Sequence, residues 1–548
     1  MTPRDPSQSS VPQSNSAPSA PPSSGRASRI RRAVLPTLML VAAVAALLLV
    51  LPSPDGAHSA GAPTANPDDP SSVITAETVF NRLYFLASDG LRGRDTPSPG
   101  LDAAAAWLVS EHRRMGLEPA GEDDTFYQRW PFRQIAPDVE NATVALTGSG
   151  GTTPVLFAEN GSLRGASDAP LDGDLVFVGD PWGAPPAAGS LDGQVMVVHL
   201  PGEITQPWRQ RANQAAARAQ EAGATASVVL VDPAMDAGTL EEFARLMANP
   251  TWRMGMDYLP PQVFLTPAAA ITAVPELGEL LSLTGEDVRE PISGARLEGS
   301  LPADVRVDGR PANVVAMIPG SDPELRNEYV VLSAHYDHVG VGTPMDGDSI
   351  YNGADDNGSG TVALLETARA IQGMSEAPRR SVLFVHVSGE EKGLLGASWF
   401  VDHPTVPEEA MIANINADMI GGDHHQDSLI VIGKTYSTLG PLVDRVNEGL
   451  PELNLITSDD LWPEQRFFFR SDQFHFMRKE IPSLFFFTGV HECYHRPCDT
   501  VERVSHDKIA RVSRLLVHSV LEIANADERP EWDPAGLAEV RELTGGGR

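Results

Sequence analysis

The stretch SVLFVHVSGEE, residues 381–391, decides the fold. Its first seven residues are mostly apolar and β-prone, which is typical of a strand buried on both faces of a sheet. Two glutamates, Glu390 and Glu391, follow this strand directly. Strands of this kind occur where helices cover both faces of a sheet, so we expect an α/β fold with charged side chains at the end of this strand.

Runs of the same character lie on both sides of this strand in the chain. The other predicted strands are NVVAMIP (313–319), EYVVLSAH (328–335), ANINADM (413–419) and SLFFFTG (483–489). The helical patterns between and after them are GTVALLETARAIQ (360–372), TLGPLVDRVNEGL (438–450) and HDKIARVSRLLVHSVLEIANA (506–526). A further helical pattern precedes them from Ala76 to Gly116. This alternation predicts a sheet flanked by helices.

The segment from about residue 141 to residue 302 has a different pattern. Two short β-prone runs, DLVFVGD (174–180) and QVMVVHL (194–200), are followed by the Ala-rich helical run RANQAAARAQEAGA (211–224) and by the strand ASVVLVD (226–232). A strand–helix–strand unit inside a longer chain predicts an inserted accessory domain. The length of 548 residues also favours two folded domains, because single cores stop growing beyond about 250 to 300 residues.

The N-terminal region predicts a membrane segment. Residues 1–32 are rich in Ser and Pro and end in four arginines, which predicts a disordered tail on the cytoplasmic side. The uncharged run 33–51 is long enough to cross a bilayer core of ~30 Å, so everything after it is expected outside the cytoplasm. Its length favours an uncleaved signal anchor. Cleavage near residues 60–62, which would make the protein secreted, is the alternative.

These patterns divide the chain into six parts. They are a tail (1–32), a membrane anchor or signal peptide (33–51), a flexible linker (52–73), an α/β domain in two pieces (74–140 and 303–530), the insert (141–302) and a C-terminal tail (531–548).

The composition excludes one class of partner. With 73 Asp plus Glu against 41 Lys plus Arg, the net charge is -32, whereas nucleic-acid binding needs clustered basic residues. The acidic balance is typical of solubility. The two cysteines, Cys493 and Cys498, flank His495, and they are either a short disulfide or two free thiols. Nothing in the sequence indicates an oligomeric state.

Acidic and imidazole side chains follow the strands at five places. The five motifs are SAHYDHVG (333–340), YNGADDNGSG (351–360), VSGEEKGLLGA (387–397), NINADMIGGD (414–423) and TGVHECYHRPCDT (488–500). Each alone has an ordinary explanation: Asp355 and Asp356 are compatible with a helix cap, and paired glutamates with the start of a surface helix. Together they place metal-type ligands at one edge of a sheet, where open α/β folds bind their ligands. Imidazole and carboxylate ligands without thiolate suit zinc or a similar divalent ion in a hydrolytic site.

On these motifs the sequence resembles the leucyl aminopeptidase and aminopeptidase Y family of cocatalytic zinc exopeptidases, which is related to glutamate carboxypeptidase II and the transferrin receptor ectodomain. The resemblance covers about residues 74–140 and 304–525, with the five motifs in the family's order and spacing. It implies a mixed, mostly parallel central sheet flanked by helices, a peptide substrate and two zinc ions per chain. The insert resembles, more weakly, a protease-associated domain, a smaller β-rich α/β domain linked in the family to substrate access.

Carried over residue by residue, the resemblance implies that Asp355 bridges the two metals. Glu391 and His495 then complete one site, and His335 and Asp418 complete the other.

The resemblance also implies the catalytic roles. Glu390 matches the general base, which takes a proton from the attacking water and delivers it to the leaving amine. Asp337 matches the carboxylate that orients His335, and the peptide between Asp355 and Asp356 is expected to be cis. His491 is left between a substrate contact and a structural role, and the other nearby histidines, His338 among them, are expected to be bystanders.

Aminopeptidase activity is therefore the main hypothesis, on the frequency of that activity in the family. A carboxypeptidase of the same family, a glutaminyl cyclase-type acyltransferase with one zinc, and a receptor-like ectodomain without metals are the alternatives. The intact ligand set argues against the last, and the ligand set together with the insert argues against the second.

Overall fold

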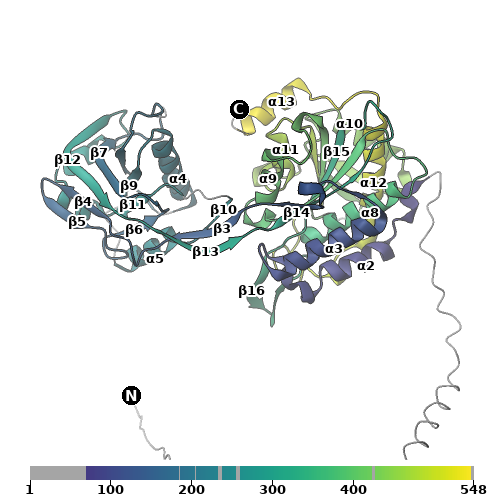
Figure 1. Cartoon of the computed structure of the whole chain (residues 1–548), viewed down its shortest axis with the longest axis horizontal. Coiled ribbons are helices and arrows are strands. Elements are labelled where there is room, and N and C mark those ends of the chain that lie inside the picture. The colour runs from purple at the N-terminus through teal and green to yellow at the C-terminus, as the bar shows by residue number, and fades with distance from the viewer. Residues whose placement is uncertain are drawn as a thin grey trace, which may run out of the picture. The chain divides into compact units, whose positions relative to one another are not determined.

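The computed structural model describes residues 69–183, 186–203, 205–231, 237–254, 259–422 and 426–544 (Figure 1). The predicted tail and the predicted membrane segment lie outside the described residues, as does the linker up to residue 68. No helix within the described ranges combines the length and the apolar character that a membrane crossing requires.

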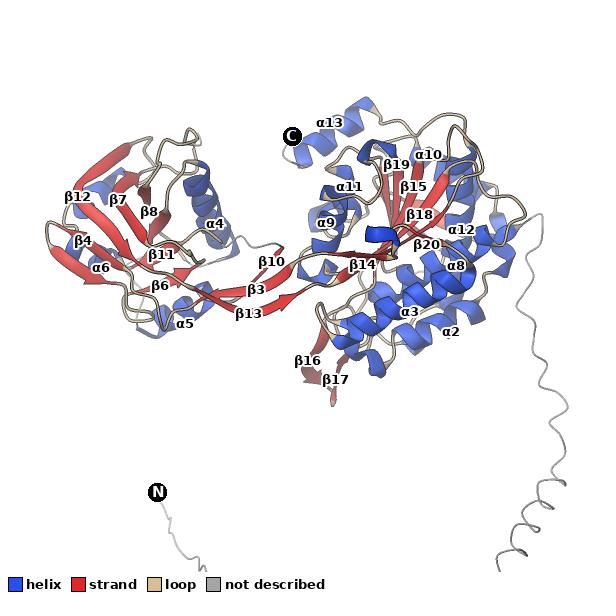
Figure 2. Ribbon diagram, in the orientation of Figure 1, coloured by secondary structure: helices blue, strands red, loops and turns tan. Residues whose placement is uncertain are grey.

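A mixed nine-stranded sheet forms the centre of the α/β domain (Figure 2). Its strands are β1 (Glu118–Pro119), β2 (Tyr127–Arg129), β14 (Ala312–Ile318), β15 (Tyr329–His335), β18 (Ser381–Val387), β19 (Met411–Ala417), β20 (Ser428–Ile432), β21 (Ile456–Ser458) and β22 (Ser483–Phe487). They run in the order β1-β14-β18-β15-β19-β22-β20-β21, with β2 also pairing with β14. The neighbours β18, β15, β19 and β22 are mutually parallel, whereas β14 and β20 join them antiparallel. The expected mixed sheet is confirmed, and its parallel part is its centre.

Helices cover both faces of this sheet. They are α2 (Ala76–Leu86), α3 (Pro99–Met115), α8 (Gly360–Gln372), α9 (Leu395–Asp402), α10 (Leu439–Glu448), α11 (Gln473–Met477), α12 (His506–Asn525) and α13 (Pro534–Leu543). Successive side chains of a strand point to opposite faces of the sheet, so each strand contributes side chains to two hydrophobic cores, one on each face. Leu332 of β15 packs in the core with α8 and α12, while its neighbour Val331 packs with Phe400 of α9 and Phe476 of α11.

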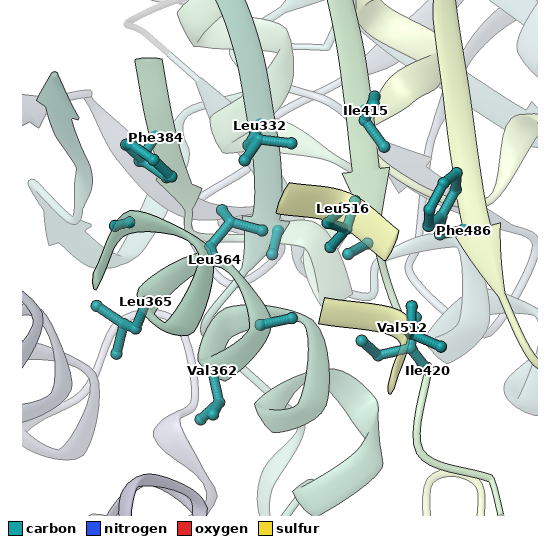
Figure 3. Close-up of a cluster of buried hydrophobic side chains, with 14 of the residues drawn as sticks. Leu332, Val362, Leu364, Leu365, Phe384, Ile415, Ile420, Phe486, Val512 and Leu516 are labelled. Carbon is teal, nitrogen blue, oxygen red and sulfur yellow. The ribbon is translucent and has the colours of Figure 1, made fainter. Parts of the chain in front are cut away.

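The larger of these two cores holds the helices in place. Leu332, Phe384, Ile415 and Phe486 from the four parallel strands lie above side chains of α8 and α12 (Figure 3). Each of the four is 0% exposed. Burying a side chain of this size contributes about 1.5 to 3 kcal/mol. The near-continuous apolar strands read from the sequence are therefore strands covered on both sides.

The insert contributes a second sheet of eight strands. They are β4 (Ala145–Gly148), β5 (Gly151–Pro154), β6 (Gly161–Arg164), β7 (Leu171–Val178), β8 (Gln194–His199), β9 (Ala226–Leu230), β11 (Gln262–Leu265) and β12 (Arg289–Gly299). Its helices are α4 (Gln206–Glu221), α5 (Ala237–Met247), α6 (Pro267–Ala273) and α7 (Leu277–Leu280). The predicted strand–helix–strand unit is β8-α4-β9, with its two strands parallel. That the insert is a protease-associated domain stays a prediction.

Short strands complete the description. A three-stranded sheet consists of β10 (Thr251–Met254), β3 (Phe132–Pro137) and β13 (Ala303–Gly309). A separate hairpin consists of β16 (Gly340–Met345) and β17 (Asp348–Tyr351). Strands β3 and β13 lead the chain into and out of the insert.

The prediction of a C-terminal tail is wrong for residues 534–543, which form α13. Asp533 caps this helix by accepting hydrogen bonds from the backbone N–H groups of Ala535 and Gly536. Val540 is buried in an apolar cluster, and the Trp532 indole donates to the Glu480 carbonyl at 2.8 Å. These anchors are tertiary contacts, which the local composition of the segment does not reveal.

Candidate metal centre

The four parallel strands end beside the four motifs that follow them in the sequence. His335 is the last residue of β15, Glu390 lies shortly after β18, Asp418 follows β19, and His495 lies in the loop after β22. Because parallel strands present their carboxyl ends at one edge, these side chains converge there. The fifth motif joins them from the turn at residues 354–359, immediately before α8.

His335 forms a first group with Asp418 and Glu390. Its Nε2 atom lies 3.4 Å from Asp418 Oδ1 and 4.0 Å from Glu390 Oε2. The other ring nitrogen, Nδ1, lies 3.2 Å from the carbonyl oxygen of Asp337 and 3.7 Å from its carboxylate. Ser471 donates to Asp418 Oδ2 at 2.7 Å, which orients that carboxylate. Asp337 thus lies where a residue that orients His335 is expected.

Glu391 and His495 form a second group with Asp356 and His338. His495 Nε2 lies 3.1 Å from Glu391 Oε2 and 3.1 Å from Asp356 Oδ2. His338 Nδ1 lies 2.8 Å from the other Glu391 oxygen, Oε1. The loop that carries His495 is closed by a disulfide between Cys493 and Cys498, so the pair is bonded and not two thiols.

Asp356 links the two groups. One of its carboxylate oxygens, Oδ1, lies 3.4 Å from His335 Nε2, and the other, Oδ2, lies 3.1 Å from His495 Nε2. A carboxylate with one oxygen toward each group is the arrangement that a bridging ligand requires.

Asp355, which the sequence predicted as the bridge, points away from both groups. Its Oδ1 accepts a hydrogen bond from the Gly421 N–H at 2.7 Å, and its Oδ2 lies 3.2 Å from His491 Nε2. His491 therefore contacts the neighbour of the bridging residue. The aspartate that faces both groups is thus Asp356, one residue after the expected bridging residue.

The backbone explains this shift by one residue. The Asp499 carboxylate accepts hydrogen bonds from the backbone N–H groups of Asp355 and Asp356, at 2.9 and 3.1 Å. These bonds fix the backbone of the turn and with it the directions of the two side chains. The cis peptide is also displaced by one residue, because it joins Asp356 to Asn357 and not Asp355 to Asp356. The expectation of a cis peptide between Asp355 and Asp356 was therefore wrong by one position, and the aspartate that faces both groups is displaced in the same direction.

The crowding of charges shifts the proton equilibria of the site. Burial alone would lower the pKa of His335, but the carboxylates of Asp418 and Glu390 raise this pKa well above its usual value. Burial, assisted by the negative charges of Glu391 and Asp418, raises the pKa of Glu390 well above its usual range. Burial would also raise the pKa of Glu391, yet hydrogen bonds from His338 and His495 lower it to about 2. Within one cluster the pKa values of the two adjacent glutamates therefore move in opposite directions: hydrogen bonds favour the ionised form of Glu391, and burial favours the neutral form of Glu390.

The donor set fits two divalent cations. Within the described part of the chain, His335 Nε2 and Asp418 Oδ1 are buried and lack a hydrogen bond of ordinary geometry, although they lie 3.4 Å apart. Buried polar atoms without partners are rare in folded proteins unless they have a functional role or a missing ligand. Imidazole nitrogens and carboxylate oxygens are the ligands of zinc in hydrolytic sites.

His338 was expected to be a bystander and instead contacts Glu391. The motif 333–340 contains a feature that could have indicated this contact, because His338 is a third polar side chain after His335 and Asp337 at the same strand end. That signal was not specific, because the fold of the loop decides which way the ring of His338 faces.

Residues 313–520 match the sequence profile of peptidase family M28. This region belongs to peptidase family M28. Two curated proteins are similar to part of this chain. Aminopeptidase YwaD of Bacillus subtilis is 27% identical over 37% of this chain and 43% of its own length. A probable leucine aminopeptidase of Arthroderma benhamiae is 27% identical over 43% of this chain and 62% of its own. The chain thus spans about half the length of these relatives.

Solved structures of similar proteins were also found. The aminopeptidase from Aneurinibacillus sp. strain AM-1 is 18% identical, with 86% of this chain and 98% of that chain covered and a TM-score of 0.46. A zinc aminopeptidase from Bacillus subtilis is 20% identical, with 83% and 97% covered and a TM-score of 0.43.

Proposed function

We propose that the protein is a zinc-dependent exopeptidase, an aminopeptidase that removes N-terminal residues from peptides with two zinc ions. The observation that carries this proposal is the Asp356 carboxylate, whose two oxygens face two separate groups of ligands. Membership of the M28 region in a peptidase family supports it.

Asp356 would contribute to both ions. His335 and Asp418 would complete one zinc site, and Glu391 and His495 the other. Two zinc ions in such a site supply Lewis acidity, which lowers the pKa of water and polarises the carbonyl of the scissile bond.

Glu390 is the residue best placed to move the proton. It follows the strand next to β15, and its Oε2 lies 4.0 Å from His335 Nε2, beside the ligand groups. Its backbone N–H donates to the Asp337 carboxylate at 3.3 Å, which fixes the turn that carries it. Burial and, after it, negative neighbours raise the pKa of Glu390; two cations would offset this effect and leave Glu390 ionised as a base. Glu390 Oε2 would then accept a proton from water and deliver it to the amine nitrogen of the leaving group.

A cleft beside the ligands supports a preference for apolar N-terminal residues. Asp356, Glu390 and Asp418 line it. The remainder of its lining is mainly apolar and aromatic, with Met419, Phe467, Phe485, Phe487, Val490 and Tyr494. An apolar wall next to a reaction centre favours burial of an apolar side chain of the substrate.

A peptide panel tests the proposal. Leu-containing peptides with free termini, with a blocked N-terminus and with an amidated C-terminus would be incubated with the zinc-loaded protein, and the products identified by mass. Cleavage that requires a free N-terminus and tolerates the amide is expected. Cleavage that requires a free C-terminus would indicate the carboxypeptidase, and cyclisation of an N-terminal glutamine the acyltransferase. A protein that binds no zinc would indicate the receptor-like alternative.

We further propose that the α/β domain lies outside the cytoplasm, held by the apolar segment 33–51 or released by its cleavage. The Cys493–Cys498 disulfide supports this location, because disulfides persist in oxidising compartments. Membrane fractionation followed by mass determination of the mature N-terminus tests it. A full-length chain in the cytoplasmic fraction would contradict it.

A further inference from the structure

The cleft beside the ligand groups contains one basic side chain among several acidic ones. Arg470 lines it together with Asp356, Glu390 and Asp418, and among the described residues that line it Arg470 is the one with a positive charge. Arg470 is exposed and lies between the short helical turn Phe467–Phe469 and α11.

The surroundings of Arg470 leave most of its donors available. Its guanidinium lies 4.8 Å from the centre of the Phe467 ring, and its Nη2 lies 3.4 Å from the Tyr494 hydroxyl. In the part of the chain that the structure describes, no carboxylate forms an ion pair with it. A guanidinium has five N–H donors in a fork that matches a carboxylate. The Phe467 ring supports this fork without neutralising it.

We propose that Arg470 binds a carboxylate of the substrate. A peptide that enters the cleft meets Asp356, Glu390 and Asp418, whose charges two zinc ions would offset, and the fixed positive charge of Arg470 at the wall. Arg470 offers the opposite charge in the same cleft. The carboxylate is either the free C-terminus of a short peptide or an acidic side chain, and both have the same chemistry. The proposal rests on the proposed peptidase activity and adds the substrate class to it.

The chain offers a matched control for Arg470. Arg466 lies four residues earlier, is also exposed, and also lies over a phenyl ring, at 4.6 Å from the centre of Phe469. It does not line the cleft. Substituting Arg466 therefore removes the same charge and the same kind of ring contact without changing the cleft.

The experiment compares pairs of substrates that differ in one charge. The zinc-loaded wild type, R470Q, R470K and R466Q would each be assayed on Leu-Leu against Leu-Leu-amide, and on Glu-p-nitroanilide against Gln-p-nitroanilide. The measured quantity is the ratio of kcat/KM for the charged substrate to that for its neutral partner. We expect R470Q to lower one of these ratios at least tenfold, R470K to retain part of it, and R466Q to leave it within twofold of the wild type.

The pattern of loss identifies the source of the carboxylate. A fall confined to the Leu-Leu pair assigns Arg470 to the terminal carboxylate, and a fall confined to the Glu and Gln pair assigns it to an acidic side chain. Unchanged ratios in R470Q, or equal changes in R470Q and R466Q, would overturn the proposal while leaving the peptidase intact. A wild type with no zinc-dependent hydrolysis of any of the four substrates would overturn the peptidase itself and this inference with it.

Discussion

Replacing each of the two adjacent aspartates by asparagine separates a bridging ligand from a structural one. Asp356 has one carboxylate oxygen toward His335 and the other toward His495, at 3.4 and 3.1 Å. In D356N one of these oxygens becomes an amide nitrogen that cannot bind a cation, and the oxygen that remains has lost its negative charge, so each zinc site is affected. Loss of an outer partner of a zinc ligand typically costs ten- to a hundredfold in affinity, and we expect the loss of a shared ligand to exceed about a hundredfold.

The Asp355 substitution is expected to act on folding instead. Asp355 accepts a hydrogen bond from Gly421 at 2.7 Å and lies 3.2 Å from His491 Nε2. Asparagine retains an acceptor for Gly421 but places an amide or a neutral oxygen against His491. Hydrogen bonds to charged groups contribute about 1.5 to 3 kcal/mol each, so D355N should lose about that much stability.

Zinc stoichiometry and unfolding decide between the two. Native mass spectrometry at a fixed, buffered zinc concentration should find two ions on D355N, as on the wild type, and fewer than two on D356N. Urea unfolding of the metal-free proteins should show the larger loss of stability for D355N. Two zinc ions on D356N together with fewer on D355N would refute the assignment of the bridge to Asp356.

Three further changes test other parts of the site and the core. E390Q should keep both zinc ions, measured by metal analysis, and lose about a hundredfold or more in kcat, because a positioned general base contributes 10² to 10⁴; full activity would remove Glu390 from the mechanism. His338 Nδ1 lies 2.8 Å from a Glu391 oxygen, so H338F should raise the zinc dissociation constant about ten- to a hundredfold in a chelator competition. H338N retains a donor and should raise this constant less. Equal effects of the two variants would contradict the orienting role of His338. His112 and His386 lie 3.0 Å apart in the core, and burial lowers the pKa of His112 to about 3 and that of His386 well below its usual value. The stability that their neutral forms provide is complete above the unfolded pKa of about 6.5 and falls by about 1.4 kcal/mol per histidine for each pH unit below it. Between pH 6.5 and 5, H112L should therefore lose about 2 kcal/mol less stability than the wild type in urea unfolding. Equal losses would refute this.

The positions of the ligand motifs could be predicted because they depend on local pattern. An apolar strand that ends in Glu390 and Glu391 indicates that the apolar core stops at these residues, and the same holds for the strand before Asp418. Parallel strands then bring these ends to one edge without any further information. The choice between Glu390 and Glu391 came from the resemblance, and the structure places Glu391 with His495 and Glu390 beside His335.

The choice between Asp355 and Asp356 could not be predicted in the same way. Both are carboxylates in one turn, and a rotation of the backbone by one residue exchanges their directions. The backbone N–H groups of Asp355 and Asp356 donate to the carboxylate of Asp499, which lies 143 residues further along the chain from Asp356. These hydrogen bonds set the rotation. The contact of His338 with Glu391 likewise depends on where two separate loops come together.

The sequence by itself determined the α/β class, the edge at which the chemistry gathers and the types of ligand available there, because strand periodicity and residue chemistry are local properties. The tertiary structure alone decided which carboxylate faces both groups, which histidine supports Glu391, and that the last described segment folds as α13. These depend on contacts between residues far apart in the chain, whose energies no local pattern contains.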